Sequence, residues 1–329
     1  MEYLNLGRSG LKVSRACLGT MNFGGDAVPP NCNEAEARRS IDAFLDAGAN
    51  FIDTANVYTA GNAEEIVGRA VADKRDKVVI ATKAAGAMGT GPNDLGLSRL
   101  HLTQALDASL RRLGTDHIDL YQTHRFDAET PLEETMDALA GFVRAGKVRY
   151  IGCSNFTGGQ IVEAQWAAAK VGGVPLTSLQ PRYSLISREI EADVLPTAAR
   201  QGLGTLTYGA LAGGVLSGKY RRGEEPGAET RYGGPMGLRG AVGFAAAAKR
   251  ALRDRNLDIA EAVAEVAAEL GVAPSAVAVA WCLTRRGVTS VILGARTAQQ
   301  LRDTLPAFDL TLPDDALKRL GDVSRIQAP

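Results

Sequence analysis

Short apolar runs rich in β-prone residues alternate with amphipathic helical segments along almost the whole chain. Strands that alternate with helices in this way form βα units, which place their strands parallel in one sheet. This alternation is the strongest constraint on the fold. Eight runs have the strand pattern, at residues 16–19, 50–53, 78–83, 118–123, 148–153, 177–180, 204–208 and 290–294.

Eight βα units predict an α/β fold, a closed (β/α)₈ TIM barrel, for which about 250 residues are typical. The chain has 329 residues, so some segments must lie outside the barrel repeat. Residues 2–13 predict a β-hairpin across the barrel floor, with its turn around Gly7 and Gly10. Residues 217–256 are rich in glycine and charge, and we expect either a disordered surface excursion or a lid.

No linker divides the sequence into two compositional halves, and no short repeat is present beyond the βα alternation. We therefore expect a single domain over residues 1–329, with long loops at the carboxyl ends of the strands. The tail enters a helix at residues 312–315 and could pack outside the barrel or over its mouth.

Several helix boundaries carry start and stop signals. Residues 130–133 predict a capping box with proline at the first helical position. Ser98 precedes an amphipathic run that ends at Gly114, and another helix is expected between Asp258 and Gly271.

The amino-acid composition indicates which kinds of molecule the protein binds. The chain is 45% hydrophobic and 22% charged, and 37 basic residues balance 37 acidic ones, which is typical of a soluble globular protein. No long basic block or basic and aromatic interleaving suggests nucleic acid or an anionic membrane. A small-molecule partner is therefore favoured.

The N-terminal residues lack the apolar segment of a secretory signal, and no apolar run is long enough to cross a bilayer. We therefore expect a cytoplasmic protein with no membrane partner. The four cysteines, Cys17, Cys32, Cys153 and Cys282, have no CxxC spacing and are expected to be inert buried thiols. No metal site is expected.

Hydrogen-bonding or charged residues follow the predicted strands. The active site of a (β/α)₈ barrel lies at the carboxyl ends of its strands, so these residues should face one mouth. The run 50–53 ends at Asp53, and Tyr58 follows five residues later. The later strand ends carry Lys83, His124, Ser154, Asn155, Gln180, Tyr208 and Arg296.

Each of these residues, taken singly, also has a structural explanation. Asp53 could cap the next loop or helix, Lys83 could be a solvated loop lysine, and His124 could be a packing histidine. Ser154 and Asn155 could form the N-cap of a helix over residues 159–170. Their joint placement at one mouth favours chemistry.

Longer motifs surround these residues: FIDTANVY at 51–58, TK at 82–83, DLYQTHR at 119–125, GKVRYIGCSNF at 146–156 and GGVLSGKY at 213–220. In these motifs the chain resembles the aldo-keto reductase superfamily over essentially its whole length. The resemblance implies a nicotinamide-dependent carbonyl reductase. No GxGxxG stretch follows a strand, so a Rossmann dinucleotide fold is not expected.

The resemblance implies a catalytic tetrad of Asp53, Tyr58, Lys83 and His124. Tyr58 would donate a proton to the carbonyl oxygen, and the Lys83 ammonium would favour ionisation of the phenol. Asp53 would keep Lys83 charged, and His124 would orient the substrate through a hydrogen bond to its carbonyl oxygen.

The resemblance also implies the seat of the cofactor. Ser154, Asn155 and Gln180 would bind the nicotinamide carboxamide, and Tyr208 would stack on the ring. Arg296 would serve the adenosine end, where its fork of donors suits a 2′-phosphate, so NADPH (NADP+) is expected rather than NADH. The other expected cofactor residues are Gly19, Thr20, Met21, Asp53, Gly209, Ala210, Leu211, Gly213, Ser217, Lys219, Gly294, Gln300 and Asp303.

The chain departs from common family patterns at several positions. Gly209 stands where a serine is frequent, which removes one hydroxyl from the phosphate end. Leu293 and Thr304 stand where proline and asparagine are frequent, which alters the adenosine end. Phe126 stands where tryptophan is frequent, which changes the shape of the substrate pocket.

The expected activity is NADPH-dependent reduction of an aldehyde or ketone to an alcohol. A specialised reductase of sugars or secondary metabolites is one alternative, and a cofactor-binding regulatory subunit of the potassium-channel β type is another. The cofactor residues disfavour an unrelated isomerase or lyase. The loops at 22–30, 84–96, 125–128 and 223–240 hold no motif that specifies a substrate, although Met21, Phe23, Tyr58 and Phe126 predict an apolar pocket wall.

Overall fold

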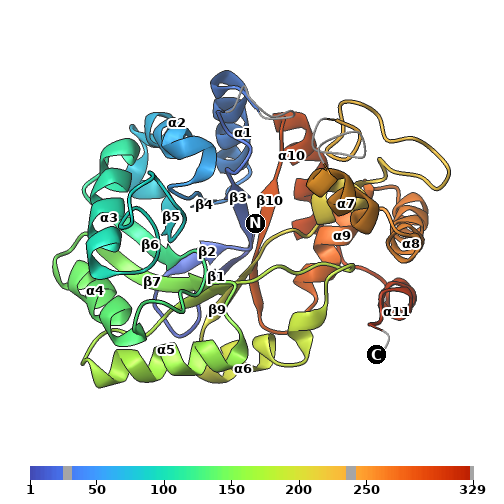
Figure 1. Ribbon diagram of the computed structural model, residues 1–329. Coiled ribbons are helices and arrows are strands. Elements are labelled where there is room, and N and C mark those ends of the chain that lie inside the picture. The colour runs from blue at the N-terminus through green and yellow to red at the C-terminus, as the bar shows by residue number, and fades with distance from the viewer. Residues whose placement is uncertain (25–31, 235–241, 327–329) are drawn as a thin grey trace.

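The structure is a computed structural model that describes residues 1–24, 32–234 and 242–326. Its barrel strands are β3 (Ala16–Gly19), β4 (Phe51–Asp53), β5 (Val79–Ala84), β6 (Ile118–Thr123), β7 (Val148–Ser154), β8 (Ser178–Gln180), β9 (Gly204–Thr207) and β10 (Val288–Gly294). They form a closed parallel barrel in the order β10-β3-β4-β5-β6-β7-β8-β9 (Figure 1). The predicted (β/α)₈ fold is confirmed.

Barrel closure joins the two ends of the chain. β10 pairs with β3 from Val291 opposite Ala16 to Gly294 opposite Gly19. The observed strands lie within two residues of the predicted ones, and β3 and β6 match them fully. β10 begins two residues early, at Val288, where its register against β9 shifts between Val288 and Ser290.

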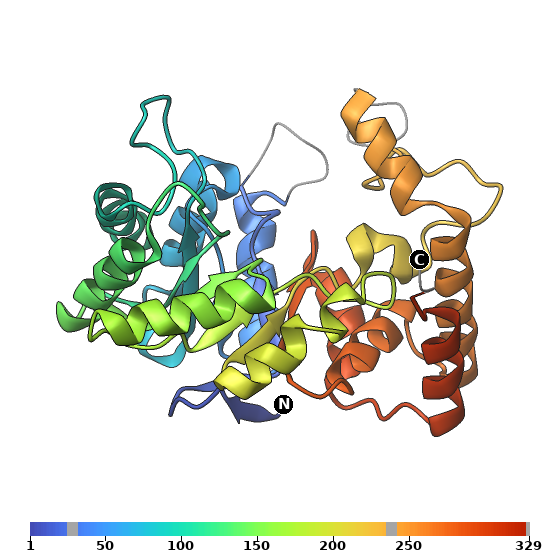
Figure 2. The ribbon, with the colours of Figure 1, turned by 60° about the horizontal axis from the view of Figure 1, so that its bottom comes forward.

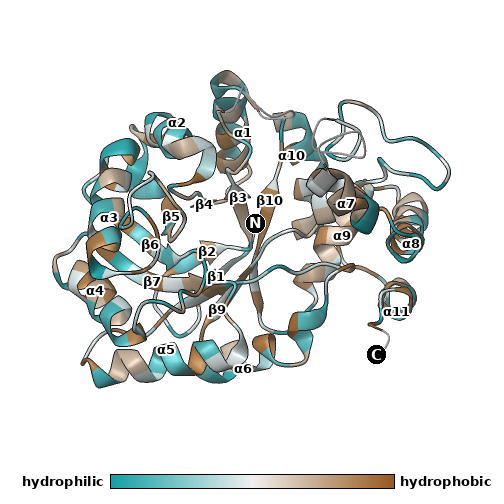
Figure 3. Ribbon diagram, in the orientation of Figure 1, coloured by the Kyte–Doolittle hydropathy of each residue, from teal (hydrophilic) through white to brown (hydrophobic). Residues whose placement is uncertain are grey.

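Helices surround the barrel, and brown apolar segments gather on strands such as β10 (Figures 1 and 3). The pattern follows from the period of each helix, which turns one apolar face towards the sheet. The helices are α1 (Glu34–Asp46), α2 (Asn62–Val71), α3 (Arg99–Leu113), α4 (Leu132–Arg144), α5 (Gly158–Lys170), α6 (Val194–Gln201), α7 (Val242–Ala251), α8 (Asp254–Leu270), α9 (Pro274–Leu283), α10 (Ala298–Thr304) and α11 (Asp314–Val323).

A predicted N-terminal hairpin closes one end of the barrel. β1 (Tyr3–Asn5) pairs antiparallel with β2 (Lys12–Ser14), and Figure 2 shows the hairpin on the opposite side of the molecule from α7. Gly7 has a left-handed φ of 59°, and a Cβ there would lie 2.4 Å from the Gly202 carbonyl oxygen. Only glycine allows this approach of the hairpin to the start of β9.

The core has two layers. The barrel interior is filled by apolar side chains, and Leu6 and Val13 of the hairpin segment pack against them. A larger layer lies between the barrel and the helices and includes Trp281, which is fully buried. All four cysteines are buried and free. The interior residues are Cys17, Phe51, Val79, Ala81, Leu120, Leu206 and Ile292.

The glycine-rich insertion contains more regular structure than the sequence indicated. Its described part includes α7 and the start of α8, where Arg222 forms ion pairs with Asp254 and Asp258. α8 begins at Asp254, one turn before the predicted start at Asp258. Residues 25–31 and 235–241, which include most of the predicted loop 22–30 and the end of 223–240, lie outside the described residues.

The tail helix α11 packs outside the barrel, because it contacts α8 and Arg319 pairs with Glu269. Over the described ranges, no single helix is long and apolar enough to cross a membrane. The pair α8 and α9 passes the same length and composition test only together, with a bend of 101° between the two helices.

Two helix starts differ from prediction. The capping box at residues 130–133 is wrong: α4 begins at Leu132 after Pro131, and the Thr130 hydroxyl instead donates to Asp127 at 2.7 Å. A capping box is present at α5, between Thr157 and Gln160, so Ser154 and Asn155 do not cap that helix. The predicted signals of α3, Ser98 and Gly114, are confirmed as its caps.

Two helical glycines give a test of the packing between α2 and α3. A Cβ at Gly68 would lie 2.4 Å from the Leu113 carbonyl oxygen, whereas at Gly141 the nearest atom would be 3.9 Å away. We expect Gly68→Ala to lower the free energy of unfolding by about 1–3 kcal/mol through overpacking. Gly141→Ala should leave it unchanged or raise it by up to about 1 kcal/mol.

Urea unfolding followed by circular dichroism measures both variants. Equal stability of Gly68→Ala and wild type would contradict the close approach of the two helices.

Candidate active site

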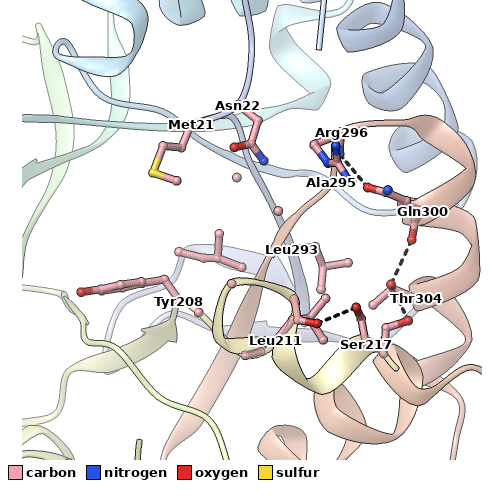
Figure 4. Close-up of a pocket in the computed structure, with 18 of the residues that line it drawn as sticks. Met21, Asn22, Tyr208, Leu211, Ser217, Leu293, Ala295, Arg296, Gln300 and Thr304 are labelled. Carbon is pink, nitrogen blue, oxygen red and sulfur yellow. Dashed lines mark hydrogen bonds between the residues drawn. The ribbon is translucent and has the colours of Figure 1, made fainter. Parts of the chain in front are cut away.

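A cavity of about 660 Å³ opens at the carboxyl ends of the barrel strands, within the usual size of small-molecule sites. Figure 4 shows part of its lining. Met21 and Tyr208 lie at one end of the view, and Arg296, Gln300 and Thr304 lie at the other.

A buried ion pair lies at the base of the first end. The Lys83 ammonium on β5 is fully buried and donates to Asp53 Oδ2 on β4 at 2.7 Å. It also donates to the Thr54 carbonyl oxygen at 2.7 Å and to the Tyr58 hydroxyl at 3.3 Å. All three ammonium protons therefore have acceptors.

The second oxygen of Asp53 is also engaged. Gln180 donates to Oδ1 at 2.8 Å and Gln122 at 3.3 Å. Burial alone lowers the pKa of Lys83, but Asp53 and Tyr58 outweigh it and the pKa is raised above its ordinary value. The lysine is therefore charged at neutral pH.

Tyr58 connects this pair to the cavity. The Lys83 ammonium lies 4.9 Å from the centre of the phenol ring as well as near its hydroxyl. Burial is the largest effect on the hydroxyl and raises its pKa, while Lys83 lowers it by less. Lys83 therefore acts on the phenol in the expected direction, but burial outweighs it and the net pKa is raised.

The turn that presents Tyr58 has a strained backbone. Thr59 and Ala60, which follow it, both have left-handed φ, of 46° and 53°. The Thr59 hydroxyl donates to the Phe23 carbonyl oxygen at 2.8 Å and accepts from the Ala63 amide at 3.1 Å. Such conformations persist when surrounding contacts fix them, and they cluster at functional sites.

His124 lies beside Tyr58. The two rings meet edge to face, with their centres 5.8 Å apart. Burial, followed by the Lys83 and Arg125 charges, lowers the pKa of His124 to about 4. The imidazole is therefore neutral at physiological pH and retains one N–H donor.

A hydrogen-bonded chain lines the same end of the cavity. Ser154 donates to the Gln180 carbonyl oxygen at 2.7 Å, and Asn155 donates to the His124 carbonyl oxygen at 3.0 Å. Tyr208 donates to the Asn155 side-chain oxygen at 2.9 Å. Asn155 has a left-handed φ of 59°, so its backbone is held away from the strand direction.

The other end of the cavity is formed by tight backbone turns and by basic side chains. Gly209, Ala212, Gly213 and Gly214 all have positive φ, a geometry that turns successive amides towards a concave surface. A Cβ at Gly213 would lie 2.4 Å from the Tyr232 hydroxyl. Arg296 donates to the Glu229 carbonyl oxygen at 2.9 Å, which links the loop after β10 to the insertion.

The predicted site residues gather in one place. Of the described residues expected at the site, all line the cavity except Thr20 and Lys83. Thr20 is fully buried and its hydroxyl donates to the Asp53 carbonyl oxygen at 3.2 Å. The prediction for Phe23 is wrong, because it packs in the core, and Phe126 packs edge to face on Phe156.

The sequence did not identify several lining residues. Arg182 follows Gln180 by two positions, and Arg231 and Tyr232 come from the glycine-rich insertion. An adjacent arginine and tyrosine in a glycine-rich stretch was the one available signal. Leu293 and Thr304, which the sequence placed at the adenosine end, also line the cavity. The other additions are Asn22, Gly214, Tyr220, Thr230, Ala273, Ser275, Val279, Ile292, Ala295 and Leu301.

The arrangement suits a nicotinamide dinucleotide. An aromatic face at Tyr208 is available for a flat ring, and turned amides with Lys219 and Arg296 are available for phosphates. The sequence profile described as the Aldo/keto reductase family matches residues 15–325. The chain belongs to the aldo/keto reductase family.

Several relatives of this aldo/keto reductase match over nearly their full length. The uncharacterized oxidoreductase YrpG of Bacillus subtilis is 41% identical over 98% of this chain and 96% of the relative. A probable voltage-gated potassium channel subunit beta of Oryza sativa is 39% identical over 94% of this chain and 92% of the relative. The Arabidopsis thaliana protein of the same name is 38% identical over the same shares.

The lowered pKa of His124 predicts a pH dependence of the free energy of unfolding. An unfolded histidine titrates near 6.5, but folded His124 does so at about 4, so only the unfolded chain takes up its proton between these values. Stability is therefore lost as pH falls from about 6.5 to about 4. Urea unfolding at pH 7 and pH 4.5 measures this loss.

The matched variant is His124→Gln, which cannot titrate. We expect its loss of stability between the two pH values to be smaller than that of wild type by about 2 kcal/mol. An identical loss of stability in both proteins would show that the pKa of His124 is not shifted in the folded protein.

Proposed function

We propose that this protein is an NADPH-dependent reductase that converts an aldehyde or ketone to an alcohol. The observation that carries the proposal is the continuous contact from Asp53 through Lys83 to the Tyr58 hydroxyl, which opens into the cavity beside His124. Carbonyl reduction needs a proton donor and a charge-stabilising group at the oxygen.

Tyr58 is the proposed proton donor. A phenol carries its proton at neutral pH and can release it as negative charge develops on a nearby oxygen, and the Lys83 charge lowers the pKa of Tyr58 against the larger effect of burial. Lys83 lies 3.3 Å from that hydroxyl and stabilises the phenolate that remains after transfer. Asp53 fixes the ammonium in this position.

His124 is the proposed orienting donor. A neutral imidazole can donate one N–H to the carbonyl oxygen without competing for the proton that Tyr58 supplies. The edge-to-face contact between the two rings supports a role for both groups at one substrate oxygen. The two groups together can stabilise a forming alkoxide.

The cofactor, when bound, supplies the hydride. We propose that Tyr208, Asn155 and Gln180 hold its nicotinamide end and that Lys219 and Arg296 bind its phosphates. The pKa of Lys219 is lowered by burial and by the neighbouring Arg296, so the site favours an anion that relieves this repulsion. A 2′-phosphate next to Arg296 would favour NADPH over NADH.

We also propose that residues 1–329 act as one domain. Support comes from the pairing of β10 with β3, which requires both ends of the barrel sequence in the same sheet.

A regulatory role is the second candidate, and the names of the plant relatives as potassium channel subunits favour it. A subunit of this type would co-purify with a channel and turn over NADPH very slowly. Rapid oxidation of NADPH with aromatic aldehydes by the isolated protein would favour the enzyme.

The role of Tyr58 is tested by Tyr58→Phe, with Tyr3→Phe, far from the cavity, as the control. We expect kcat for an aromatic aldehyde to fall by about 10²–10⁴-fold, because the general acid is removed. The Kd of NADPH, measured by fluorescence titration, should change by less than about twofold. Turnover near wild type would refute the assignment.

Lys83→Met tests the electrostatic role of the lysine. A loss of kcat comparable to that of Tyr58→Phe is expected, together with a changed pH–rate profile, because the phenol loses its cationic neighbour. A profile that superimposes on wild type would argue against this role.

Arg296→Met tests the proposed cofactor preference, with Arg302→Met, an exposed arginine on α10, as the control. The Kd of NADPH should rise by about tenfold while the Kd of NADH changes little, because only NADPH has a 2′-phosphate. Equal changes for both cofactors would place Arg296 elsewhere along the dinucleotide.

A further inference from the structure

A second cavity of about 430 Å³ lies beside the main one. The two share Asn155 and Arg182, so these side chains stand at their junction. The second cavity has an apolar side and a polar rim. The apolar side comprises Phe156, Pro181, Ile190 and Val194, and the rim comprises Thr157, Ser187 and Glu189.

Arg182 is a free cation at this junction. Its side chain is exposed and forms no hydrogen bond or ion pair within residues 1–24, 32–234 and 242–326. Arg188, six residues later, shows the contrast, because it bonds Glu191, Ser324 and the Gly321 carbonyl oxygen. An arginine left with five unused donors is available to a ligand.

Gly209 lies beside the Arg182 side chain. The Arg182 Cγ atom lies 3.6 Å from where a Cβ of Gly209 would be, and the Arg182 backbone bridges to that of Tyr208. The charge of Arg182 reaches Tyr208 and lowers its pKa, against the larger effect of burial, which raises it.

A single residue, Asn155, lies between the second cavity and the proposed catalytic groups. Asn155, which lines both cavities, donates to the His124 carbonyl oxygen and accepts from Tyr208. Phe156 packs edge to face on Phe126, two residues beyond His124, with ring centres 5.4 Å apart. A molecule whose carbonyl group reaches Tyr58 and His124 can therefore extend past Asn155 towards this cavity.

We propose that the second cavity is a subsite for the distal part of the substrate, and that Arg182 binds an anionic group on that part. This inference rests on the proposed reductase function. The apolar side of the second cavity would hold a hydrocarbon or aromatic portion of the substrate. The Arg182 guanidinium would pair with a carboxylate or phosphate at the substrate's end. Glu189 on the rim interacts electrostatically with Arg255, and the positive charge of Arg255 offsets the negative charge of Glu189.

The substrate class that follows is an aldehyde or ketone with an apolar middle and an anionic end. The cofactor is a second source of anionic groups, because Arg182 also lines the main cavity. The test must therefore separate substrate recognition from cofactor binding.

The kinetic test compares 3- and 4-carboxybenzaldehyde with their methyl esters, in wild type and Arg182→Met. In wild type, kcat/KM should be about tenfold higher for at least one acid than for its ester. Arg182→Met should abolish this difference and leave the ester unchanged. Arg149→Met, an exposed arginine at the amino end of β7, should behave like wild type.

The binding test does not depend on turnover. With the NADP+-loaded protein, calorimetry should show benzoate binding about tenfold more tightly than benzamide, and equal binding in Arg182→Met. Val194→Phe, which partly fills the second cavity, should weaken binding of both aldehyde classes without changing the Kd of NADPH.

Three results would overturn the proposal. The first is equal kcat/KM for acids and esters in wild type with equal binding of benzoate and benzamide. The second is a tenfold weaker Kd of NADPH in Arg182→Met with the preference for acids intact, which would assign the arginine to a cofactor phosphate. The third is an unchanged benzoate preference in Arg182→Met.

If the proposed reductase function is wrong, the kinetic and binding experiments give a different result. In that case neither acids nor esters are reduced by wild type, while benzoate binding still reports on the subsite. Reduction of the esters without any preference for acids leaves the reductase function intact and removes only the subsite.

Discussion

The buried pair of Asp53 and Lys83 determines the geometry of the whole site. An ammonium group with no solvent exposure is costly unless its partners are close and its protons are all bonded. The partners here come from four barrel strands, because Asp53 is on β4, Lys83 on β5, Gln122 on β6 and Gln180 on β8. One ion pair therefore fixes the strand ends relative to one another, and Tyr58 takes its position from the same ammonium.

Much of the fold could be predicted from sequence because the barrel repeats a simple pattern. Each strand is a short apolar run flanked by helices, so β3 and β6 were located to the residue. The start of α4 was not, because Thr130 bonds Asp127 rather than its own helix, and a competing tertiary partner leaves no local signature. The described part of the insertion was also beyond sequence reasoning, since α7 follows a glycine-rich segment.

The candidate site was predictable where its residues follow strands, and less so where they come from loops. Asp53, Lys83 and His124 follow β-strand patterns, so their convergence follows from the barrel itself. Arg182 and Tyr232 reach the cavity through irregular segments whose path no periodicity encodes. The effect of Lys83 on Tyr58 could be predicted, but the larger effect of burial on the Tyr58 pKa could not, since burial depends on the packing of the completed site.

The left-handed turn at Thr59 and Ala60 bears on how this enzyme could be evolved in the laboratory. Each such residue costs about 1–3 kcal/mol, and the hydroxyl of Thr59 helps to hold the turn against the Phe23 carbonyl group. A selection for heat tolerance alone would favour glycine here, since glycine accepts this backbone without the penalty. The same replacement would loosen the segment that presents Tyr58, so libraries at these two positions should be screened for turnover alongside thermal resistance.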